Sequence, residues 1–348
     1  MMEKKVFELL LLLLNQNEEI SEGDFLKSFK DRHPDSMDPR EFFKNIYQLH
    51  YLSSLIEDER IKEIILHGHR HLQIEKKRGL RDMEIKNISP LTFKYSLEML
   101  AHKNNISWNF TEPYPSFFTK INGLKFRATL VHPCTGIKNQ AKLFLRKIRK
   151  DIFNYSDFEV PGNGQVFLKE RVRACDNIII AGRAGSGKTS FLATLMGDIP
   201  KDHHIVVLED THEIPKLSKN FSFFLGQEGQ SKKSLKDYYS LSLRLRPDRI
   251  ILGEMRSYEI IPLILSLNTG HRGVLSTIHS DCAKESLIKM ALLFNLYAEN
   301  PGFSFETSLK IICNNIDYVI YMENQKIKEV IRVIGSTKEN VLYENKMW

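Results

Sequence analysis

The chain has 348 residues, of which 42% are hydrophobic and 27% are charged. This composition, without an excess of proline or glycine, is typical of a globular protein that buries a core, and it excludes a low-complexity chain. The net charge of +7 and the pI of about 9.0 permit contact with nucleic acid or an anionic membrane, but a solvated surface with a basic bias explains them as well.

The start of the chain and its cysteines bear on where the protein works. The apolar run from Val6 to Leu14 is shorter than the roughly 20 residues that cross a bilayer, and no small-residue cleavage site follows it. The cysteines are scattered without the spacing of metal ligands, which argues against a zinc site and favours free thiols in a reducing compartment. They are Cys134, Cys175, Cys282 and Cys313. We therefore expect a soluble, cytoplasmic protein.

The amino-terminal half predicts helices followed by an α+β domain. Residues 1–50 alternate leucine-rich stretches with polar turns, which indicates a helical extension whose role the sequence leaves open; we expect its apolar run Val6 to Leu14 to dock on a partner or at a membrane surface. Residues 51–150 predict the α+β domain, because short β-like runs, a helix and basic strands follow one another there. These elements are Ile61–His67, Leu72–Lys76, the helix Pro90–Lys103 and the strands Lys125–His132 and Lys142–Lys150. In the first basic strand Phe126, Ala128 and Leu130 face one way.

The carboxyl-terminal half predicts an α/β domain. Residues 151–165 are rich in turn-forming residues and are a linker candidate. Over residues 166–348, apolar strands alternate with helices, which predicts a mostly parallel sheet covered on both faces. The expected strands are Asn177–Ala181, Ile205–Leu208, Arg249–Leu252 and Gly273–Ile278.

A glycine-rich loop follows the first of these strands. It reads Gly182-Arg183-Ala184-Gly185-Ser186-Gly187-Lys188-Thr189, with Ser190 next. The strand before it and the helix Thr189–Gly197 after it are the context that the P-loop motif requires. Glycines let several backbone N–H groups point at one phosphate, and the helix N-terminus adds its positive end. The loop therefore predicts that ATP and Mg²⁺ bind here, with Lys188 on the β- and γ-phosphates and the Thr189 hydroxyl on Mg²⁺.

Polar side chains end the other three predicted strands. Glu209-Asp210, Glu254 and His279 follow strands that we expect to be parallel. In open α/β sheets the ligand lies at the carboxyl ends of the strands, so all three groups are expected near the γ-phosphate. Glu209 and Glu254 suit water positioning and Mg²⁺ contacts, directly or through water, and His279 suits detection of the γ-phosphate. The alternative for each is a surface carboxylate or a structural histidine.

Four motifs in this order resemble those of the secretion ATPases of type II and type IV secretion systems and type IV pili. Among these, the chain is most similar to the short VirB-eleven type and the CpaF-like pilus ATPases. Besides the P-loop, the motifs are the Asp box Ile205-Val206-Val207-Leu208-Glu209-Asp210-Thr211-His212-Glu213-Ile214, the Walker B Leu245-Arg246-Pro247-Asp248-Arg249-Ile250-Ile251-Leu252-Gly253-Glu254-Met255-Arg256, and the His box Asn268-Thr269-Gly270-His271-Arg272-Gly273-Val274-Leu275-Ser276-Thr277-Ile278-His279.

The resemblance extends upstream, so that it covers about residues 60–335. Its weaker parts are Lys62 to Gly68, Ile121 to Arg127 with His132-Pro133, and Phe144 to Lys147. The chain departs from the family at Arg183-Ala184, which are variable loop positions, and at Arg272, where a proline is common. It also lacks the tetracysteine module of the type II assembly ATPases, which argues against that branch.

The resemblance implies a fold and a function. It implies a RecA-like P-loop core in the carboxyl half, a PAS-like α+β domain in the amino half, and a ring of six chains with ATP between the two domains. It places Arg127 and Arg146 on the phosphates. ATP hydrolysis would power type IV secretion, or assembly of a type IV or Tad-like pilus, at the cytoplasmic face of the inner membrane. The implied partners are inner-membrane secretion or pilus platform proteins, with peripheral membrane association.

Two other functions fit parts of the sequence. A RecA-like nucleic-acid motor fits the basic charge, but no stretch interleaves basic and aromatic residues for a strand channel, and no direct nucleic-acid readout is expected. A scaffold that only binds nucleotide is disfavoured because Lys188, Thr189, Glu209 and Glu254 are all present. The cargo, the choice between secretion and pilus assembly, and which glutamate is the principal base are left open.

Overall fold

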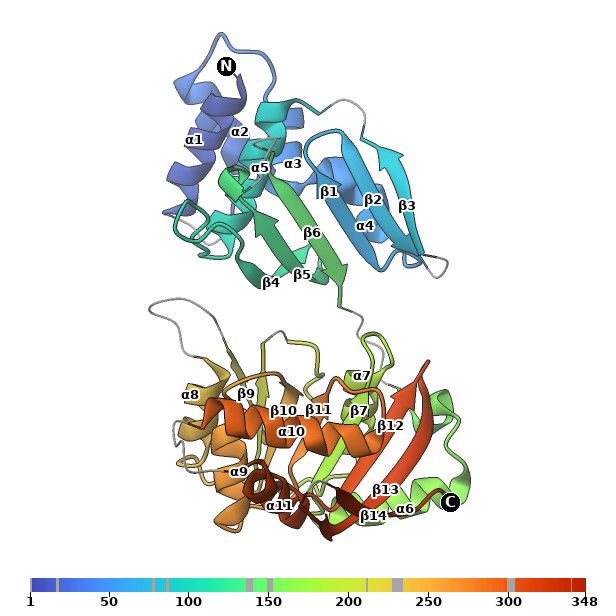
Figure 1. The fold of residues 1–348 in the computed structure, drawn as a ribbon. Helices are drawn as coiled ribbons and strands as arrows, with labels where there is room; N and C mark the ends of the chain where they lie inside the picture. The colour runs from blue at the N-terminus through green and yellow to red at the C-terminus, as the bar shows by residue number, and fades with distance from the viewer. Residues whose placement is uncertain are drawn as a thin grey trace. The chain divides into compact units, whose positions relative to one another are not determined.

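The structure is a computed structural model, and it describes most of the chain. The described residues are 2–16, 19–76, 79–85, 88–135, 140–148, 153–210, 212–226, 234–298, 304–338 and 340–348. The chain forms two compact units, Met1–Arg149 and Lys150–Trp348, which are drawn in Figure 1. Each unit has its own sheet and its own hydrophobic core, so each is described by itself.

The first 50 residues form helices, as the leucine-rich stretches predict. The helical elements up to residue 57 are α1 (Met2–Leu14), α2 (Glu22–Arg32), α3 (Arg40–Gln48), the 3-10 turn η1 (His50–Leu52) and α4 (Ser53–Glu57). Helix α2 begins where the Ser21 hydroxyl accepts a hydrogen bond from the Asp24 N–H, which satisfies one of the donors that a helix start leaves unpaired.

The apolar face of α1 packs inside the first unit. Val6 and Leu10 are fully buried, and the Phe7 ring stacks on Tyr95 at 4.6 Å between centroids. Tyr95 belongs to α5 (Pro90–Lys103). We expected the run Val6 to Leu14 to dock on a partner or at a membrane surface, and this expectation was wrong because its large side chains fill a core with α2, α3 and α5.

The sheet of the first unit is antiparallel throughout its described part. Its strands are β1 (Glu63–His67), β2 (His71–Lys76), β3 (Gly79–Glu84), β4 (Ser116–Ile121), β5 (Leu124–Val131) and β6 (Lys142–Lys147), with the turn η2 (Pro133–Thr135) between the last two. They lie in the order β3-β2-β1-β6-β5-β4. Phe126, Ala128 and Leu130 of β5 are buried on one face, as predicted. Strands β3 and β4 were not predicted, and β6 ends before Lys150, which lies outside the described residues.

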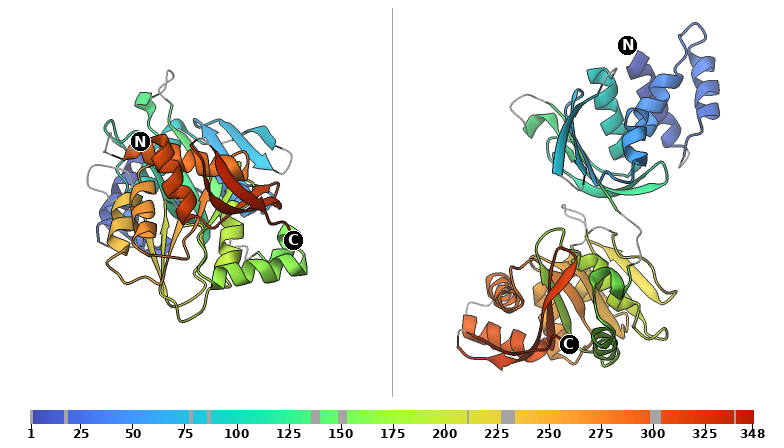
Figure 2. Two further views of the ribbon diagram at one scale, coloured as in Figure 1. Left: turned by 60° about the horizontal axis from the view of Figure 1, so that its bottom comes forward. Right: turned by 90° about the vertical axis from the view of Figure 1, so that its right-hand side faces the viewer.

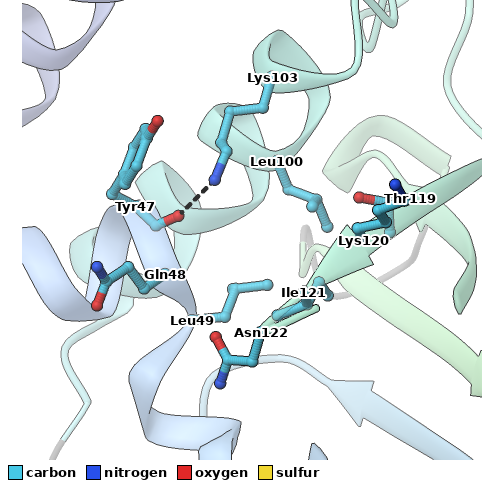
Figure 3. Close-up of a pocket in the computed structure, with 9 residues that line it drawn as sticks. All are labelled: Tyr47, Gln48, Leu49, Leu100, Lys103, Thr119, Lys120, Ile121 and Asn122. Atoms are coloured by element: carbon cyan, nitrogen blue, oxygen red, sulfur yellow. Dashed lines mark hydrogen bonds between the residues drawn. The ribbon is translucent and has the colours of Figure 1, made fainter. Parts of the chain in front are cut away.

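The first unit also holds a cavity of about 210 Å³. It lies between the end of α3, helix α5 and strand β4 (Figure 3). The Lys103 ammonium at its wall donates a hydrogen bond to the Tyr47 carbonyl at 3.2 Å. No residue that the sequence singled out for chemistry lines this cavity, so it is distinct from the site described below.

The sheet of the second unit is mostly parallel. Its strands are β7 (Ile178–Gly182), β8 (Ile205–Glu209), β9 (Phe221–Leu225), β10 (Arg249–Met255), β11 (Leu275–Ile278), β12 (Tyr318–Glu323), β13 (Lys326–Ser336) and β14 (Val341–Asn345). In the order β14-β13-β12-β7-β11-β10-β8-β9, the pairs from β12 to β9 are parallel, whereas β13 and β14 are antiparallel. The four predicted strands are present within a residue or a few, and the antiparallel additions make the sheet mixed.

Helices cover both faces of this sheet (Figure 2). They are α6 (Gly162–Arg173), α7 (Lys188–Met196), α8 (Leu235–Ser242), α9 (Ile260–Asn268), α10 (Ala283–Tyr297) and α11 (Phe305–Asn315), with the 3-10 turn η3 (Tyr155–Phe158) before α6. Helices α6 and α7 pack on one face with η3, and α8 to α11 pack on the other.

The described part of the linker candidate, residues 153–165, belongs to the second unit. Residues 151 and 152 lie outside the described residues. From Tyr155 onward the chain forms η3 and then begins α6, and Tyr155, Phe158 and Val160 are buried. In the described part of the chain, no helix is both long and apolar enough to cross a membrane.

Candidate functional site

The candidate site lies at the carboxyl edge of the parallel strands in the second unit. Strands β7, β11, β10 and β8 are neighbours in that order and run parallel. Parallel strands bring their carboxyl ends to one edge of a sheet. The P-loop follows β7, His279 follows β11, Glu254 lies near the end of β10, and Glu209 ends β8. The topology therefore brings the predicted residues of this unit to one edge.

The P-loop connects β7 to α7 and has the backbone of a phosphate cradle. Gly185 and Gly187 have φ angles of 72° and 91°, a left-handed region that glycine adopts without a steric cost. The predicted nucleotide-binding residues Gly182, Arg183, Ala184, Gly185, Ser186, Gly187, Lys188, Thr189 and Ser190 run from the end of β7 into the first turn of α7. The Ser186 hydroxyl is buried and has no hydrogen-bond partner among the described residues.

Lys188 folds back onto the loop that precedes it. Its ammonium donates to the carbonyl oxygens of Gly182 and Arg183, each at 2.9 Å, and lies 3.3 Å from His279 Nδ1. Burial lowers the pKa of Lys188 to about 8, although the Glu254 charge opposes this shift. Because an ammonium has only donors, the Nδ1 of His279 acts as the acceptor.

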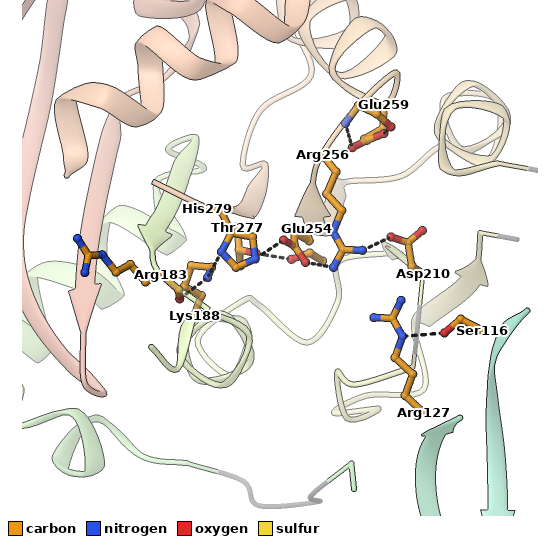
Figure 4. A network of polar contacts seen from close by, with 12 residues as sticks. Ser116, Arg127, Arg183, Lys188, Asp210, Glu254, Arg256, Glu259, Thr277 and His279 are labelled. Atoms are coloured by element: carbon orange, nitrogen blue, oxygen red, sulfur yellow. Dashed lines mark hydrogen bonds and ion pairs between the residues drawn. The ribbon is translucent and has the colours of Figure 1, made fainter. Parts of the chain in front are cut away.

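A chain of polar contacts continues from His279 (Figure 4). Its Nε2 lies 2.7 Å from Glu254 Oε1, and the other oxygen of Glu254 accepts from Arg256. Burial and the Lys188 charge lower the pKa of His279, which fits a neutral imidazole with its hydrogen on Nε2. Burial disfavours the charge of Glu254, but the Arg256 guanidinium outweighs it and the pKa of Glu254 is lowered. Glu254 is therefore an ionised carboxylate.

Glu209 is held differently from Glu254. It is 2% exposed, and its Oε1 accepts hydrogen bonds from the N–H groups of Glu213 and Ile214 at 3.0 and 2.9 Å. Its Oε2 lies 3.3 Å from His212 Nδ1. Burial raises the pKa of Glu209 against these contacts. The next residue, Asp210, lies 3.5 Å from an Arg256 nitrogen, and Thr211 of the same motif lies outside the described residues.

Arg256 is the residue at this edge that sequence reasoning missed. Its guanidinium contacts both Glu254 and Asp210, and thus ties the end of β10 to the end of β8. Its backbone N–H donates to the buried carboxylate of Glu259. A signal was present, because Arg256 lies only two residues after Glu254, directly past the end of β10. Arg183 of the P-loop is likewise paired, at 2.7 Å from Asp281.

Arg127 and Arg146 lie in the first unit, on neighbouring strands. They are direct partners across β5 and β6, so their side chains share one face of the sheet. The same row contains Glu63, opposite Arg146, and Phe118, opposite Arg127. Arg127 is half-buried and its Nε donates to Ser116 Oγ at 3.2 Å, whereas Arg146 is exposed. The structure therefore brings the two arginines together.

Comparison with known proteins identifies the family. A profile described as Type II/IV secretion system protein matches residues 120–317, which is more than half of the chain. The chain belongs to the family of type II/IV secretion system proteins, as its motifs predict.

Its relatives include proteins of transfer and secretion systems. The chain is similar to the Type IV secretion system protein VirB11 of Bartonella henselae, with 26% identity over 294 residues, which is 71% of this chain and 80% of that protein. It is 27% identical over 292 residues to the Conjugal transfer protein TrbB of Rhizobium radiobacter, which is 80% of this chain and 86% of that one. This chain therefore covers most of the length of both relatives.

A solved structure with a similar fold is that of the pilus retraction motor PilT with bound ADP. The TM-score is 0.59 at 19% identity, over 85% of this chain and 81% of that chain. The Legionella pneumophila ATPase DotB gives a TM-score of 0.57 at 17% identity, over 86% and 78% of the two chains. These likenesses show a shared mixed α/β fold.

Proposed function

We propose that this protein is an ATPase motor of a type IV secretion or related pilus machinery. The observation that carries the proposal is the contact of Lys188 with His279 and of His279 with Glu254, directly beside a P-loop backbone. Family membership and the systems for which the relatives are named, secretion and conjugal transfer, point to the same class. The finer fold assignments, a RecA-like core and a PAS-like amino domain, are part of this proposal.

The described residues fit a nucleotide phosphate. The left-handed glycines open the loop, the buried Ser186 hydroxyl is left without a partner among the described residues, and Lys188 is held at the loop by two carbonyls. An anion placed in the loop supplies acceptors for the backbone N–H groups and restores a full charge to Lys188, because a nearby anion favours its protonated form. Residues Gly182 to Ser190 are therefore proposed to bind ATP.

We propose that the strand ends also supply oxygen donors to Mg²⁺, a hard cation that takes oxygen ligands and keeps several waters, although no three His, Cys, Asp or Glu side chains of the described residues form a preformed metal site. The Thr189 hydroxyl and the carboxylates of Glu209, Asp210 and Glu254 are the oxygen donors, directly or through water. When bound, Mg²⁺ neutralises charge on the β- and γ-phosphates. The binding of Arg256 to both Glu254 and Asp210 holds two of these carboxylates in place.

We assign the role of principal base to Glu254. A base that accepts a proton from water must be ionised and must have an oxygen that the water reaches. Glu254 meets the first condition through Arg256, and its side chain is more exposed than that of Glu209, 20% against 2%, although its Oε1 atom is itself buried. Glu209 is almost fully buried, and its carboxylate is held by two backbone N–H groups. This arrangement suits a fixed contact to Mg²⁺ through water.

We propose that Arg127 and Arg146 together bind nucleotide phosphate. Two like charges directly opposite each other destabilise a sheet, and a shared anion removes this repulsion. A guanidinium presents several donors and binds phosphate oxygens in two places. The pair is thus suited to sense whether the γ-phosphate is present, which can drive a change of conformation between nucleotide states.

The motor is proposed to be a homo-hexamer that works with platform proteins at the cytoplasmic face of the inner membrane. Light scattering with a non-hydrolysable ATP analogue measures the assembly, and a monomer under every nucleotide condition would contradict a ring. The function itself is tested by phosphate release from ATP and Mg²⁺ by the purified protein. We expect turnover that single-stranded DNA does not stimulate. Strong stimulation would favour the nucleic-acid motor, and binding without turnover would favour the scaffold.

A further inference from the structure

The turn between β12 and β13 contacts the P-loop. Strand β12 is the parallel neighbour of β7, with Met322 opposite Gly182, so the turn that follows it emerges beside the loop. There the backbone N–H of Gln325 donates a hydrogen bond to the carbonyl oxygen of Ser186 at 3.1 Å. This bond joins the turn to the peptide unit between Ser186 and Gly187, in the centre of the cradle.

The hydrogen bond from Gln325 to Ser186 determines the direction of the Gly187 N–H. In a trans peptide the C=O and N–H of one unit point in opposite directions, and the described residues contain no cis peptide. When Ser186 O is held from the side of the turn, the N–H of Gly187 is directed to the other side. The backbone N–H groups of such a loop are the groups that hold a phosphate, so the orientation of this peptide matters for binding.

The turn has an unusual backbone for its sequence. Asn324 and Gln325 both have positive φ angles, 51° and 62°, as in the two-residue turns that usually carry glycine. Asparagine tolerates this region, but glutamine adopts it at a cost. The Lys326 ammonium, 2.6 Å from the Glu159 carboxylate, anchors the turn to the segment after η3.

The Asn324–Gln325 turn packs closely against the P-loop. A Cβ atom on Gly187 would lie 3.3 Å from Gln325 Cγ and 3.5 Å from the Phe158 ring. The first distance is tighter than ordinary van der Waals contact, and Phe158 is 2% exposed. The loop is therefore packed between the turn and η3, and a change in the turn is felt at Gly187.

We propose that the Asn324–Gln325 turn is a positioning element of the nucleotide site. Its Gln325 N–H holds the Ser186–Gly187 peptide so that the Gly187 N–H is aimed at the phosphate before nucleotide arrives. The proposal rests on the proposed function, because it assumes that the P-loop binds nucleotide. It gives no role to the side chain of Asn324.

The test compares two substitutions at one position. Asn324→Gly keeps a positive φ and should leave ADP affinity unchanged. Asn324→Pro imposes a φ near −65°, which changes the turn and moves the Gln325 N–H away from Ser186. We expect Asn324→Pro to bind ADP at least about tenfold more weakly, the scale of one hydrogen bond to a charged group. Inserting one glycine between Asn324 and Gln325 displaces the same N–H without proline and should weaken binding likewise.

An NMR measurement distinguishes a changed orientation of the Ser186–Gly187 peptide from a general loss of folding. Ser186-Gly187 is the only Ser-Gly pair in the sequence. Serine labelled with ¹³C at the carbonyl and glycine labelled with ¹⁵N can be introduced together by cell-free synthesis. Only the Ser186–Gly187 peptide then carries both labels, so an NMR experiment that selects for a bonded ¹³C carbonyl and ¹⁵N shows one amide signal, that of Gly187. ADP should shift this signal in the wild type and in Asn324→Gly. In Asn324→Pro the signal of the nucleotide-free protein should already differ, while the melting temperature stays close to that of the control.

The outcomes distinguish this inference from the function on which it rests. If wild type and Asn324→Gly bind ADP, and both turn variants bind it equally well with an unchanged Gly187 signal, the positioning role is wrong while the nucleotide site stands. If the wild type binds neither ADP nor ATP, the proposed function fails, and this inference fails with it. Weaker binding in both turn variants, with an altered Gly187 signal, supports the positioning role.

Discussion

The cations that we propose for phosphate binding have different surroundings in the two units of the molecule. In the second unit, Lys188 is held by two carbonyls and a histidine, and Arg256 is paired with two carboxylates. In the first unit, Arg127 and Arg146 stand directly opposite each other on neighbouring strands. Lys188 and Arg256 are therefore surrounded by acceptors, whereas Arg127 and Arg146 face each other, with Glu63 opposite Arg146 on the other side.

We infer a different role for each set of cations. Lys188 already donates to two carbonyls and contacts His279, so binding to phosphates exchanges some of these contacts, whereas the carboxylates that Arg256 contacts are held in place beforehand. Arg127 and Arg146 share one face of a sheet, so that one anion can accept hydrogen bonds from both guanidinium groups. The second unit is thus suited to chemistry, and the first is suited to detecting phosphate.

The largest effect is expected at Lys188. Lys188→Ala should abolish ATP turnover, because the β- and γ-phosphates lose their main cationic contact. Phosphate release by the purified variant measures this. Circular dichroism serves as the control for folding, since Lys188 also bonds two loop carbonyls. Turnover close to the wild-type rate would remove the P-loop from the mechanism.

The next largest effects are expected at the two glutamates, Glu254 and Glu209, and their sizes should differ. Glu254→Gln should retain ATP binding and lower turnover by roughly a hundredfold or more, the scale of a lost acid/base group. Glu209→Gln should also lower turnover, but less than Glu254→Gln if Glu254 is the base. The measurement is kcat at saturating ATP, made under the same conditions for both variants. A larger loss in Glu209→Gln would reverse our assignment, and normal turnover in both would exclude these residues from the mechanism.

The arginine pair should have a smaller effect on turnover. Arg127→Ala and Arg146→Ala, singly and together, should lower turnover by about tenfold to a thousandfold, less than the ~10³–10⁵ of a single arginine finger because two side chains share the contact. ATP affinity, turnover and small-angle scattering with and without nucleotide are measured on the same preparations. A double variant that turns over ATP normally, with a normal response in scattering, would leave these arginines as surface charge.

Much of the second unit could be predicted because its signals are local. The buried strands, the glycine loop and the polar residues after each strand lie in short runs, and the parallel topology then places them at one edge. Lys188, His279 and Glu254 do lie in contact, although their roles stay predictions. Arg256 was not predicted because it lies past the end of β10, and only the fold brings Asp210 within its reach.

Other features depend on tertiary packing that no short pattern encodes. The apolar face of α1 suggested a docking surface, but its partners α2, α3 and α5 come from later in the chain. Strand β3 has every residue exposed, so it shows no hydrophobic period. The Asn324–Gln325 turn was also missed, because glutamine at positive φ is no turn signal. The pairing of Arg127 with Arg146 follows from strand register, which the turn and the opposing strand decide.

The smallest expected effect tests the repulsion itself. Arg127→Thr replaces one of the two like charges with a good strand former, and should raise the free energy of unfolding of the first unit by about 0.2–1 kcal/mol, the range of cross-strand pairs. Arg127→Lys is the matched control, since it keeps the charge and should give no such gain. The lost hydrogen bond to Ser116 opposes the gain but lies at an exposed position, where it contributes little.

Urea unfolding of the full chain, followed by a probe in the first unit, measures the change, since two units need not unfold together. Salt should reduce the advantage of Arg127→Thr over the wild type, because exposed charges are screened within about 10 Å at 0.1 M ionic strength. Pyrophosphate should reduce it as well, because an anion bound between the arginines stabilises only the chain that has both. If Arg127→Thr is instead less stable than the wild type at low salt, the two arginines do not repel each other measurably, and the contrast between the two units rests on geometry alone.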